Sequence, residues 1–226
     1  MTPCPNCGQP TPDDARFCAN CGHALVTRVG AEERRHVTAL FADLVASTSL
    51  SDQLDPEVVR GVVSQFFERS IAEIRRFGGS AEQFRGDAIM ALFGLQQAHE
   101  DDPERAVRAA FAVRDGLAAL APEAAQRHGI ALQLRIGIEA GEVVVGDPFG
   151  GSTMATGDVL NLAARLEEHA APGEIVVGPA VHAATERDIA YEPAGTWEIR
   201  GKAAPVSTWR AVAHTAVPGG LRGLPG

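Results

Sequence analysis

The sequence is poor in aromatic residues and contains no long apolar run. Phe, Trp and Tyr make up 5% of its 226 residues, so a hydrophobic core must rely on Val, Leu, Ile and Ala. Apolar stretches such as residues 37–45 are far shorter than the roughly 20 residues of a membrane-spanning helix. The N-terminus has neither a basic nor an apolar segment, which argues against a signal peptide. We therefore expect a cytoplasmic protein with one full-sized core and a small appendage.

Positive charge is also scarce. The chain has 20 Lys and Arg against 29 Asp and Glu, a formal net charge of -9. A chain of this charge is a poor general ligand for nucleic acid or for an anionic membrane, so we expect neither as a partner. A local basic pocket for phosphate groups remains compatible with the composition.

Cysteine is absent beyond residue 21. The four cysteines form two C-x-x-C pairs with ten residues between them: Cys4, Cys7, Cys18 and Cys21. Two such turns supply the four sulfur ligands that tetrahedral zinc prefers. Gly8 and Gly22 follow the pairs, where a knuckle turn often needs a positive φ. We expect residues 1–24 to form a zinc ribbon with one structural Zn²⁺, whose binding supplies the folding energy.

Two other interpretations of the cysteines remain. Two disulfides would suit a secreted protein, which nothing here indicates. A thioredoxin-like redox pair would need a surrounding βαβ pattern. Zinc ribbons bind nucleic acid or proteins, or serve structure alone. Only Arg16 and Arg28 add positive charge nearby, so we favour a structural role or a protein partner.

The rest of the chain alternates strand and helix patterns. After a linker at 25–34, Asp55-Pro56 is typical of a helix start, and Gly78-Gly79 of its end. Gly86-Asp87 predicts a hairpin turn. We expect strands at 36–45, 80–85, 88–93, 131–139, 142–147, 174–177, 189–200 and 205–212, a short helix before Asp55, and helices at 55–77, 102–128 and 158–169. The pattern predicts an α+β fold with a largely antiparallel sheet, followed by a Pro/Gly-rich tail or linker at 213–226.

Two carboxylates stand out because they lie in apolar runs. Asp43 ends the first strand, and Asp87 follows Gly86 at the hairpin turn. If the hairpin pairs with the first strand, the two carboxylates converge. Converging carboxylates bind hard divalent ions, and paired ions suit displacement at phosphorus. Taken singly, each Asp is more typical of a turn or a cap than of a metal site.

Other polar residues suit a phosphate ligand. Ser47 and Thr48 follow Asp43 at a strand-to-helix turn, where backbone N–H groups can meet phosphates. Asn161 and Arg165 are four apart and share a helix face, although a solvent-facing polar stripe has the same spacing. The Arg200–Lys202 segment offers two cations, or forms a plain turn.

Five segments, in this order, resemble the class III adenylyl/guanylyl cyclase domain: VTALFADLVASTSL, FRGDAIMALFG, LRIGIEAGEVVVGD, TGDVLNLAARLE and IRGKAAPVSTWR. The resemblance covers residues 35–212. EDDPERAVRAA and the zinc ribbon resemble a bacterial branch of that family. The resemblance implies a ferredoxin-like βαββαβ-type domain. It also implies an adenylate-cyclase-type lyase that forms 3′,5′-cyclic nucleotide and pyrophosphate from ATP or, less favoured, GTP.

The resemblance also implies site roles and an assembly. The roles are binding of two Mg²⁺ or Mn²⁺ ions by Asp43, Asp87 and the Leu44 carbonyl, ribose orientation and transition-state stabilisation by Asn161 and Arg165, and binding of the terminal phosphates by Arg200 or Lys202. In this family one subunit brings the metals and the other brings Asn and Arg. The chain is therefore expected to form a head-to-tail homodimer.

Three positions depart from the family pattern. Gln83 stands where adenylyl cyclases usually carry Lys, and Met154 where they carry Asp or Thr; both positions contact the purine. Ala46 replaces a common Gly of the phosphate turn. These departures leave open a weakly active or inactive nucleotide-binding regulatory module, and a zinc-ribbon adaptor is a third hypothesis. The LRGLPG ending suggests a linker to a further region.

Overall fold

The computed structural model describes residues 2–4, 6–12, 15, 17–22, 32–45, 55–83, 88–128, 132–146, 154–202 and 204–215 of the chain. The chain divides into two compact units, residues 1–34 with 144–156 and residues 35–143 with 157–226. In the described ranges, no helix combines the length and the apolar character needed to cross a membrane.

The smaller unit contains two short strand pairs. Strand β1 (Thr2–Pro3) pairs antiparallel with β2 (Pro10–Thr11), next to the cysteine turns. The end of the long strand β6 (Gln133–Gly146) pairs antiparallel with β7 (Met154–Thr156). Neither β1, β2 nor β7 was expected from the sequence, because strands of two or three residues carry too little pattern.

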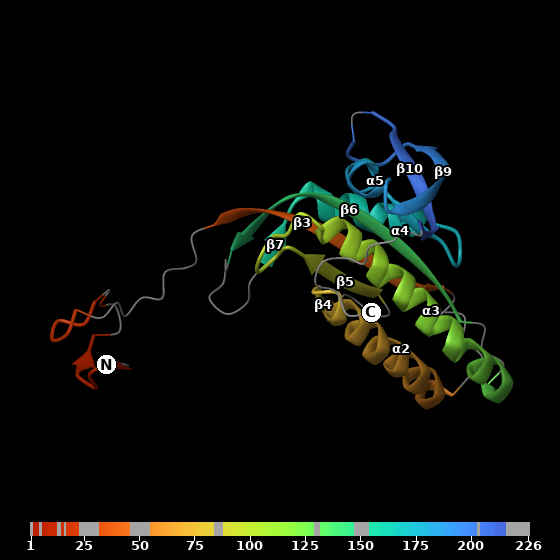
Figure 1. Cartoon of the computed structure of the whole chain (residues 1–226). Helices are drawn as coiled ribbons and strands as arrows, with labels where there is room; N and C mark the ends of the chain where they lie inside the picture. The colour runs from red at the N-terminus through yellow and green to blue at the C-terminus, as the bar shows by residue number, and fades with distance from the viewer. Residues whose placement is uncertain are drawn as a thin grey trace. The chain divides into compact units, whose positions relative to one another are not determined.

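The larger unit is built on a mixed sheet (Figure 1). Its strands are β3 (Glu33–Val45), β4 (Ser80–Gln83), β5 (Ala88–Phe93), β6, β8 (Ile175–Val177), β9 (Ile189–Trp197) and β10 (Val206–His214). They lie in the order β4-β5-β3-β6-β8-β10-β9. Strands β6 and β8 are parallel, whereas β3–β5, β4–β5, β8–β10 and β9–β10 are antiparallel. The α+β fold with a mostly antiparallel sheet is therefore confirmed.

Two long helices, α2 (Pro56–Arg76) and α3 (Asp102–His128), lie side by side on one face of this sheet (Figure 1). The predicted N-cap is present: the Asp55 side chain accepts a hydrogen bond from the Glu57 amide at 2.8 Å. Gly78, with φ +85°, follows the end of α2. The order β3-α2-β4-β5-α3-β6, with β4, β5, β3 and β6 as successive neighbours, is the expected ferredoxin-like βαββαβ arrangement.

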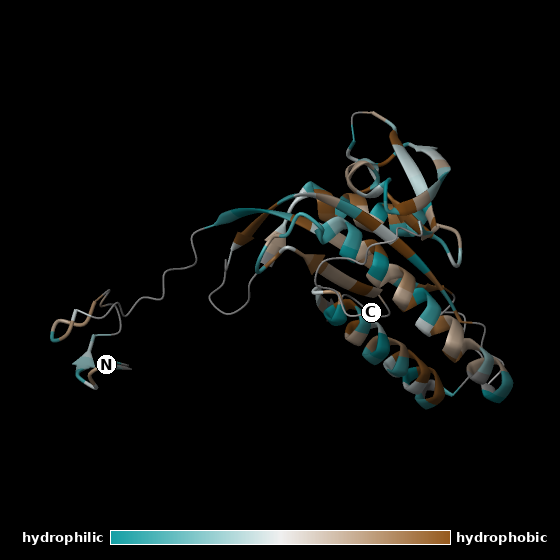
Figure 2. Ribbon diagram, in the orientation of Figure 1, coloured by the Kyte–Doolittle hydropathy of each residue, from teal (hydrophilic) through white to brown (hydrophobic). Residues whose placement is uncertain are grey.

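The main core lies between these helices and the sheet. Alternate residues of each strand enter it, including Leu40, Ala42 and Leu44 of β3 and Ile136 and Ile138 of β6. Figure 2 shows hydrophobic residues concentrated along these strands. Because side chains alternate along a strand, Asp43, Arg135 and Gly137 lie on the opposite face.

Helix α4 (Asp158–His169) covers that opposite face, and α5 (Pro179–Thr185) follows β8. The bounds of α4 agree with the predicted helix at 158–169. A second apolar cluster joins Leu162 and Leu166 of α4 to Val176 of β8 and to Ile199. Gly137 allows the α4 backbone to approach β6 closely, because a Cβ there would lie 2.9 Å from the Glu167 Cα atom.

Two expectations about the elements were wrong. The strands expected at 131–139 and 142–147 are one continuous strand, β6, because Ala140 and Gly141 stay in the ladder instead of turning. A glycine at 141 suits close packing against α4, because a Cβ added there would lie 3.3 Å from the Val159 side chain. Helix α5 was not expected, since seven residues show no clear period. The short helix before Asp55 and the tail beyond 215 lie outside the described residues, and the domain boundaries stay predictions.

Candidate active site

Asp43 lies at the carboxyl end of β3, on the face that α4 covers. Its backbone pairs with Ala88 of β5, the residue after Asp87, so the predicted pairing of the hairpin with the first strand is confirmed. The Asp43 side chain is 19% exposed and accepts a hydrogen bond from Arg135 Nη2 at 2.8 Å. A partly accessible carboxylate at a strand end suits a hard divalent ion. Asp87 itself lies outside the described residues.

The other residues expected near the metals and the purine are only partly described. The Leu44 side chain is buried in the main core. Gln83 ends β4 and Met154 begins β7, but their side chains lie outside the described part of the structure. Ser47, Thr48 and Ala46 lie outside it entirely. Their expected roles therefore stay predictions.

Asn161 and Arg165 lie on the accessible side of α4, opposite the buried Leu162 and Leu166. Arg165 forms an ion pair with Glu168, and its carbonyl lies 2.8 Å from His169 Nδ1. The apolar residues fix one side of the helix against the sheet. The polar side of α4, which carries Asn161 and Arg165, therefore points away from the sheet and can contact a ligand or another chain.

The Arg200–Lys202 turn sits against the start of α4. Gly201 has φ +94°, and the Lys202 amide donates to the Ile199 carbonyl at 3.0 Å. Ile199 is buried against α4, and the Lys202 ammonium forms an ion pair with Asp158. Arg200 and Lys202 line a cavity of about 420 Å³. The structure therefore gathers Lys202, Asn161 and Arg165 on or against α4, whereas Asp43 lies at the carboxyl end of β3.

A buried carboxylate, which the sequence did not reveal, adjoins Lys202. Glu139 is 3% exposed and lines a cavity of about 370 Å³ together with Asp158 and Lys202. Burial raises the pKa of Glu139. Hydrogen bonds from the Ala140 and Val181 amides, at 2.8 and 3.3 Å, and the charge of Lys202 act in the opposite direction.

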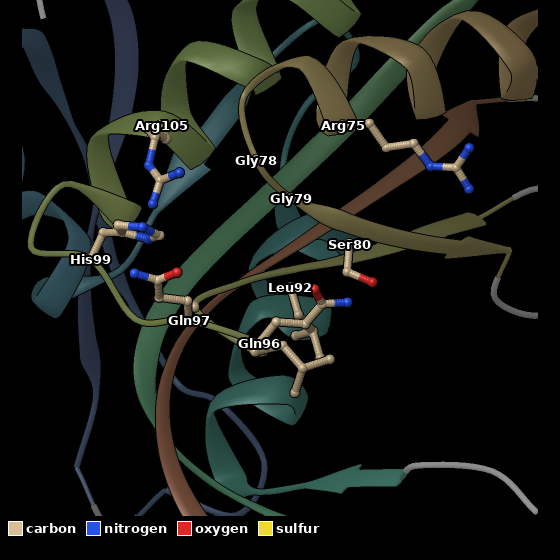
Figure 3. Close-up of a pocket in the computed structure, with 11 residues that line it drawn as sticks. Arg75, Gly78, Gly79, Ser80, Leu92, Gln96, Gln97, His99 and Arg105 are labelled. Carbon is tan, nitrogen blue, oxygen red and sulfur yellow. The ribbon is translucent and has the colours of Figure 1, made fainter. Parts of the chain in front are cut away.

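A larger cavity, of about 520 Å³, lies at the turn between α2 and β4 (Figure 3). Arg75, His99 and Arg105 line it, which first suggests an anion site. However, Arg105 forms ion pairs with Asp101 and Asp102, and its Nη1 atom lies 3.5 Å from the Phe77 carbonyl. Its charge is balanced within the fold. Arg105 therefore acts as a structural tie between α3 and the end of α2.

The four cysteines form a tight cluster in the smaller unit. Their sulfurs lie within 4.8 Å of one another, and they form no disulfide. Gly8 and Gly22 have φ +72° and +70°, and their amides donate to the Cys4 and Cys18 carbonyls. The expected pair of knuckle turns is confirmed.

Hydrogen bonds around the cluster favour the thiolate at Cys7, whereas burial raises the pKa of the Cys4 thiol to about 11. Asn6 Nδ2 lies 3.6 Å from the Cys21 sulfur, and Asn20 Nδ2 lies 3.6 Å from the Cys7 sulfur. A hydrogen bond from the Gln9 backbone and one from Asn20 lower the pKa of the Cys7 thiol to about 6. This donor set fits one tetrahedral zinc ion.

Arg135 and Glu167 are site residues that the sequence analysis missed. Arg135 contacts Asp43, and its Nε atom lies 3.2 Å from Glu167 Oε1. The signal that identified Asp43, a charge inside an apolar run, is also present at Leu134-Arg135-Ile136. Recognising it required knowing that β6 lies beside β3.

Known proteins place the chain in a family. A sequence model of the adenylate and guanylate cyclase catalytic domain matches residues 29–211, and a zinc-ribbon model matches residues 4–25. The first match covers most of the chain. The chain therefore belongs to the adenylate and guanylate cyclase catalytic domain family, and it carries an N-terminal zinc-ribbon domain.

Solved structures agree with this assignment. The adenylyl cyclase CyaB from P. aeruginosa is similar with a TM-score of 0.78 and 26% identity, over 83% of this chain and 98% of that one. The guanylyl cyclase Cya2 is similar with a TM-score of 0.77 and 28% identity, over 83% and 96%.

Curated relatives are much longer than this chain. Adenylate cyclase 1 of Rhizobium meliloti is 30% identical over 186 residues, which are 79% of this chain and 28% of that protein. An uncharacterized protein of the same organism is 34% identical over 185 residues, 80% of this chain and 18% of its own length. The chain thus spans less than a third of these two proteins.

Proposed function

We propose that the chain is a two-metal nucleotidyl cyclase that converts ATP, less favourably GTP, into 3′,5′-cyclic nucleotide and pyrophosphate as a head-to-tail homodimer. The observation that carries the proposal is that the described site residues lie on two different elements. Asp43 lies at the end of β3, whereas Asn161, Arg165 and Lys202 lie on or against α4. Two such half-sites meet when two copies associate head to tail. A cytoplasmic location, where thiols stay reduced, belongs to the same proposal.

The first half-site would hold the metals. Asp43, Asp87 and the Leu44 carbonyl offer oxygen ligands of the kind that Mg²⁺ and Mn²⁺ prefer. Two bound ions would neutralise triphosphate charge and lower the pKa of the ribose 3′-hydroxyl. Ser47 and Thr48 would add hydroxyl and amide donors to the phosphates.

The second half-site would act on the transition state. The ribose 3′-oxygen attacks the α-phosphorus. The bond between the α-phosphorus and the oxygen that bridges it to the β-phosphorus breaks, and pyrophosphate leaves. Arg165 would donate hydrogen bonds to the oxygens on which charge develops, and Asn161 would orient the ribose. Arg200 or Lys202 would hold the terminal phosphates. For that role Lys202 must exchange its ion pair with Asp158 for the nucleotide.

The proposed preference for ATP comes from two of the similar proteins. The match to a protein named adenylate cyclase 1 favours ATP, and so does the likeness to CyaB, but Cya2 is a guanylyl cyclase. Gln83 can donate or accept a hydrogen bond, and Met154 does neither well.

A cyclase-like module that binds nucleotide with little turnover is the second candidate. The ion pairs that already engage Arg165 and Lys202 favour it. In the adaptor alternative, Phe17 of the ribbon, 64% exposed, would contact a protein partner.

Complementation tests the proposal. Purified protein with Mn²⁺ and ATP or GTP should form cyclic nucleotide, and Asp43→Ala and Arg165→Ala should each reduce turnover at least about 100-fold. A mixture of these two inactive variants should recover up to about one quarter of wild-type activity, since half of the dimers would contain one intact site. Arg114→Ala, which removes an exposed pair with Asp115, is the matched control and should behave as wild type.

Two results would contradict the proposal. Recovery of no activity on mixing, from two variants that are each folded, would exclude shared sites. Binding of nucleotide without any product, under every metal and nucleotide combination, would leave the regulatory module instead.

A further inference from the structure

A cavity of about 370 Å³ lies where β6, the starts of α4 and α5, and β10 meet. Its volume is within the range of about 300–1,000 Å³ that is typical of small-molecule sites. Apolar side chains form much of its wall: Val159 and Leu162 of α4, Pro179 and Ala180 of α5, and Val206 of β10. Such a wall favours a ligand with an apolar body.

Glu139 brings a buried carboxyl group to this cavity. The residue is 3% exposed, and its Oε1 atom accepts hydrogen bonds from the Ala140 and Val181 amides at 2.8 and 3.3 Å. Within the described part of the chain, Glu139 forms no ion pair, since the Lys202 ammonium that shares the cavity pairs with Asp158. A carboxylate that is withdrawn from water is stabilised by a cation at contact distance.

The charge of the lining favours a cation over an anion. Three carboxylates, those of Glu139, Glu142 and Asp158, line the cavity together with one ammonium, that of Lys202. A metal ion does not fit this arrangement, because its ligand atoms must converge on one point. Among the described residues, only the four cysteines bring three or more such atoms within 4.8 Å of one another. The lining therefore suits an organic cation that is larger than a metal ion and partly apolar.

We propose that this cavity binds a small aliphatic amine in its protonated form, with the ammonium group at Glu139 and the alkyl chain against Val159, Leu162 and Val206. Hydrogen bonds between an ammonium and a carboxylate are stronger than those between neutral groups, and burial of the alkyl chain adds a hydrophobic contribution. Binding of the amine does not depend on the proposed function. Because Lys202 lines the same cavity, the amine would lie beside the residue to which the proposed function assigns the terminal phosphates.

Methyl NMR of the full chain tests the site directly. n-Butylammonium chloride is titrated into protein that is labelled at the Val and Leu methyl groups, with sodium chloride at the same ionic strength as the reference. We expect saturable shifts at Val159, Leu162 and Val206, with a Kd of about 1 mM or tighter. n-Butanol, which has the same carbon chain without the charge, should bind at least about tenfold more weakly.

Two variants separate recognition of the charge from filling of the cavity. Glu139→Gln keeps an oxygen acceptor for the Ala140 and Val181 amides but removes the charge, and it should weaken n-butylammonium binding at least about tenfold. Ala180→Leu keeps the charge but adds bulk at an exposed position of α5 that lines the cavity, and it should weaken n-butylammonium and n-butanol alike. Glu192→Gln is the matched control, because it removes one exposed carboxylate of β9 outside the cavity and should bind as wild type does.

Equal affinities for n-butylammonium and n-butanol, or shifts that never saturate, would overturn the inference. So would a loss of affinity in Glu192→Gln equal to that in Glu139→Gln, since net charge alone would then explain both. If Glu139→Gln does not fold, Ala180→Leu decides, and wild-type affinity in that variant overturns the inference. Saturable, charge-dependent binding by a chain that forms no cyclic nucleotide would support the inference while the proposed function fails.

Discussion

A methyl group at residue 137 tests whether activity depends on the distance between α4 and the sheet. Gly137 lies on β6 directly against α4. An added Cβ would lie 2.9 Å from the Glu167 Cα atom, and closer still to the Glu167 amide nitrogen and the Ala163 carbonyl oxygen. Cβ atoms essentially never approach other atoms within 3.0 Å, and helix backbone cannot rotate away as a side chain can. We expect Gly137→Ala to move α4 outward by roughly 1 Å, because close-packed interiors transmit such strain.

Gly137→Ala should lower both the stability of the domain and its turnover, but by different amounts. Overpacking of this kind costs about 1–3 kcal/mol, out of a typical domain stability of about 5–15 kcal/mol. The variant should therefore fold, with a melting temperature lower by about 2–4 °C per kcal/mol. Asn161 and Arg165 move with the helix, and a misplacement of about 1 Å can cost about 100-fold in rate. Turnover should thus fall far more than stability does.

The assay measures kcat with Mn²⁺ and ATP well below the melting temperature, together with thermal unfolding by circular dichroism. Gly116→Ala in α3 is the control, because nothing lies within 4 Å of its added Cβ. Alanine is a better helix former than glycine by about 0.5–1 kcal/mol, so this variant should be slightly stabilised and fully active. A Gly137→Ala variant with a lowered melting temperature and wild-type kcat would refute the reasoning, and so would one in which neither changes.

Two further predictions concern the zinc cluster and Glu139. The purified chain should contain one zinc ion per molecule by elemental analysis, and Cys7→Ser should lose it while basal turnover stays unchanged; retention of stoichiometric zinc would contradict the four-cysteine site. Because burial raises the pKa of Glu139 above its ordinary value of 4.5, the folded state favours the protonated form. The free energy of unfolding should therefore fall as the pH rises above about 4.5. Glu139→Gln should reduce this slope in urea unfolding between about pH 5 and 8, and equal slopes in both proteins would contradict the assignment.

Local signals predicted most of the larger unit. Asp55-Pro56 caps α2 as expected, and the helical period of residues 158–169 matches α4. The errors in the predicted elements lie where contacts between distant segments determine the structure. The two strands expected at 131–139 and 142–147 are one strand, in which Gly141 leaves room for the Val159 side chain of α4. The alternation that places Asp43 and Arg135 on one face is visible in the sequence, but the neighbouring order of β3 and β6 is not.

The candidate site residues that the sequence analysis singled out are those whose signal lies within one segment. Asp43 was identified by the cost of a carboxylate in an apolar run, and Asn161 and Arg165 by their helical spacing. Lys202 and Asp158 are 44 residues apart, and their ion pair exists only because the β9–β10 turn meets the start of α4. Glu139 was missed because its long-range hydrogen bond comes from Val181 of α5, a helix the pattern did not reveal.

The connection between β6 and β8 has a consequence for control. The two strands are parallel, and the chain between them contains α4. Past the helix, the Gly173 amide donates to the Leu134 carbonyl at 2.7 Å, and the Ile136 amide donates to the Glu174 carbonyl at 3.0 Å. The end of α4 is thus fastened to the sheet by two backbone hydrogen bonds, so the helix cannot tilt away there without breaking the β6–β8 ladder. In the proposed homodimer, a regulatory signal would therefore act by rotating one protomer against the other instead of lifting α4 from its own sheet.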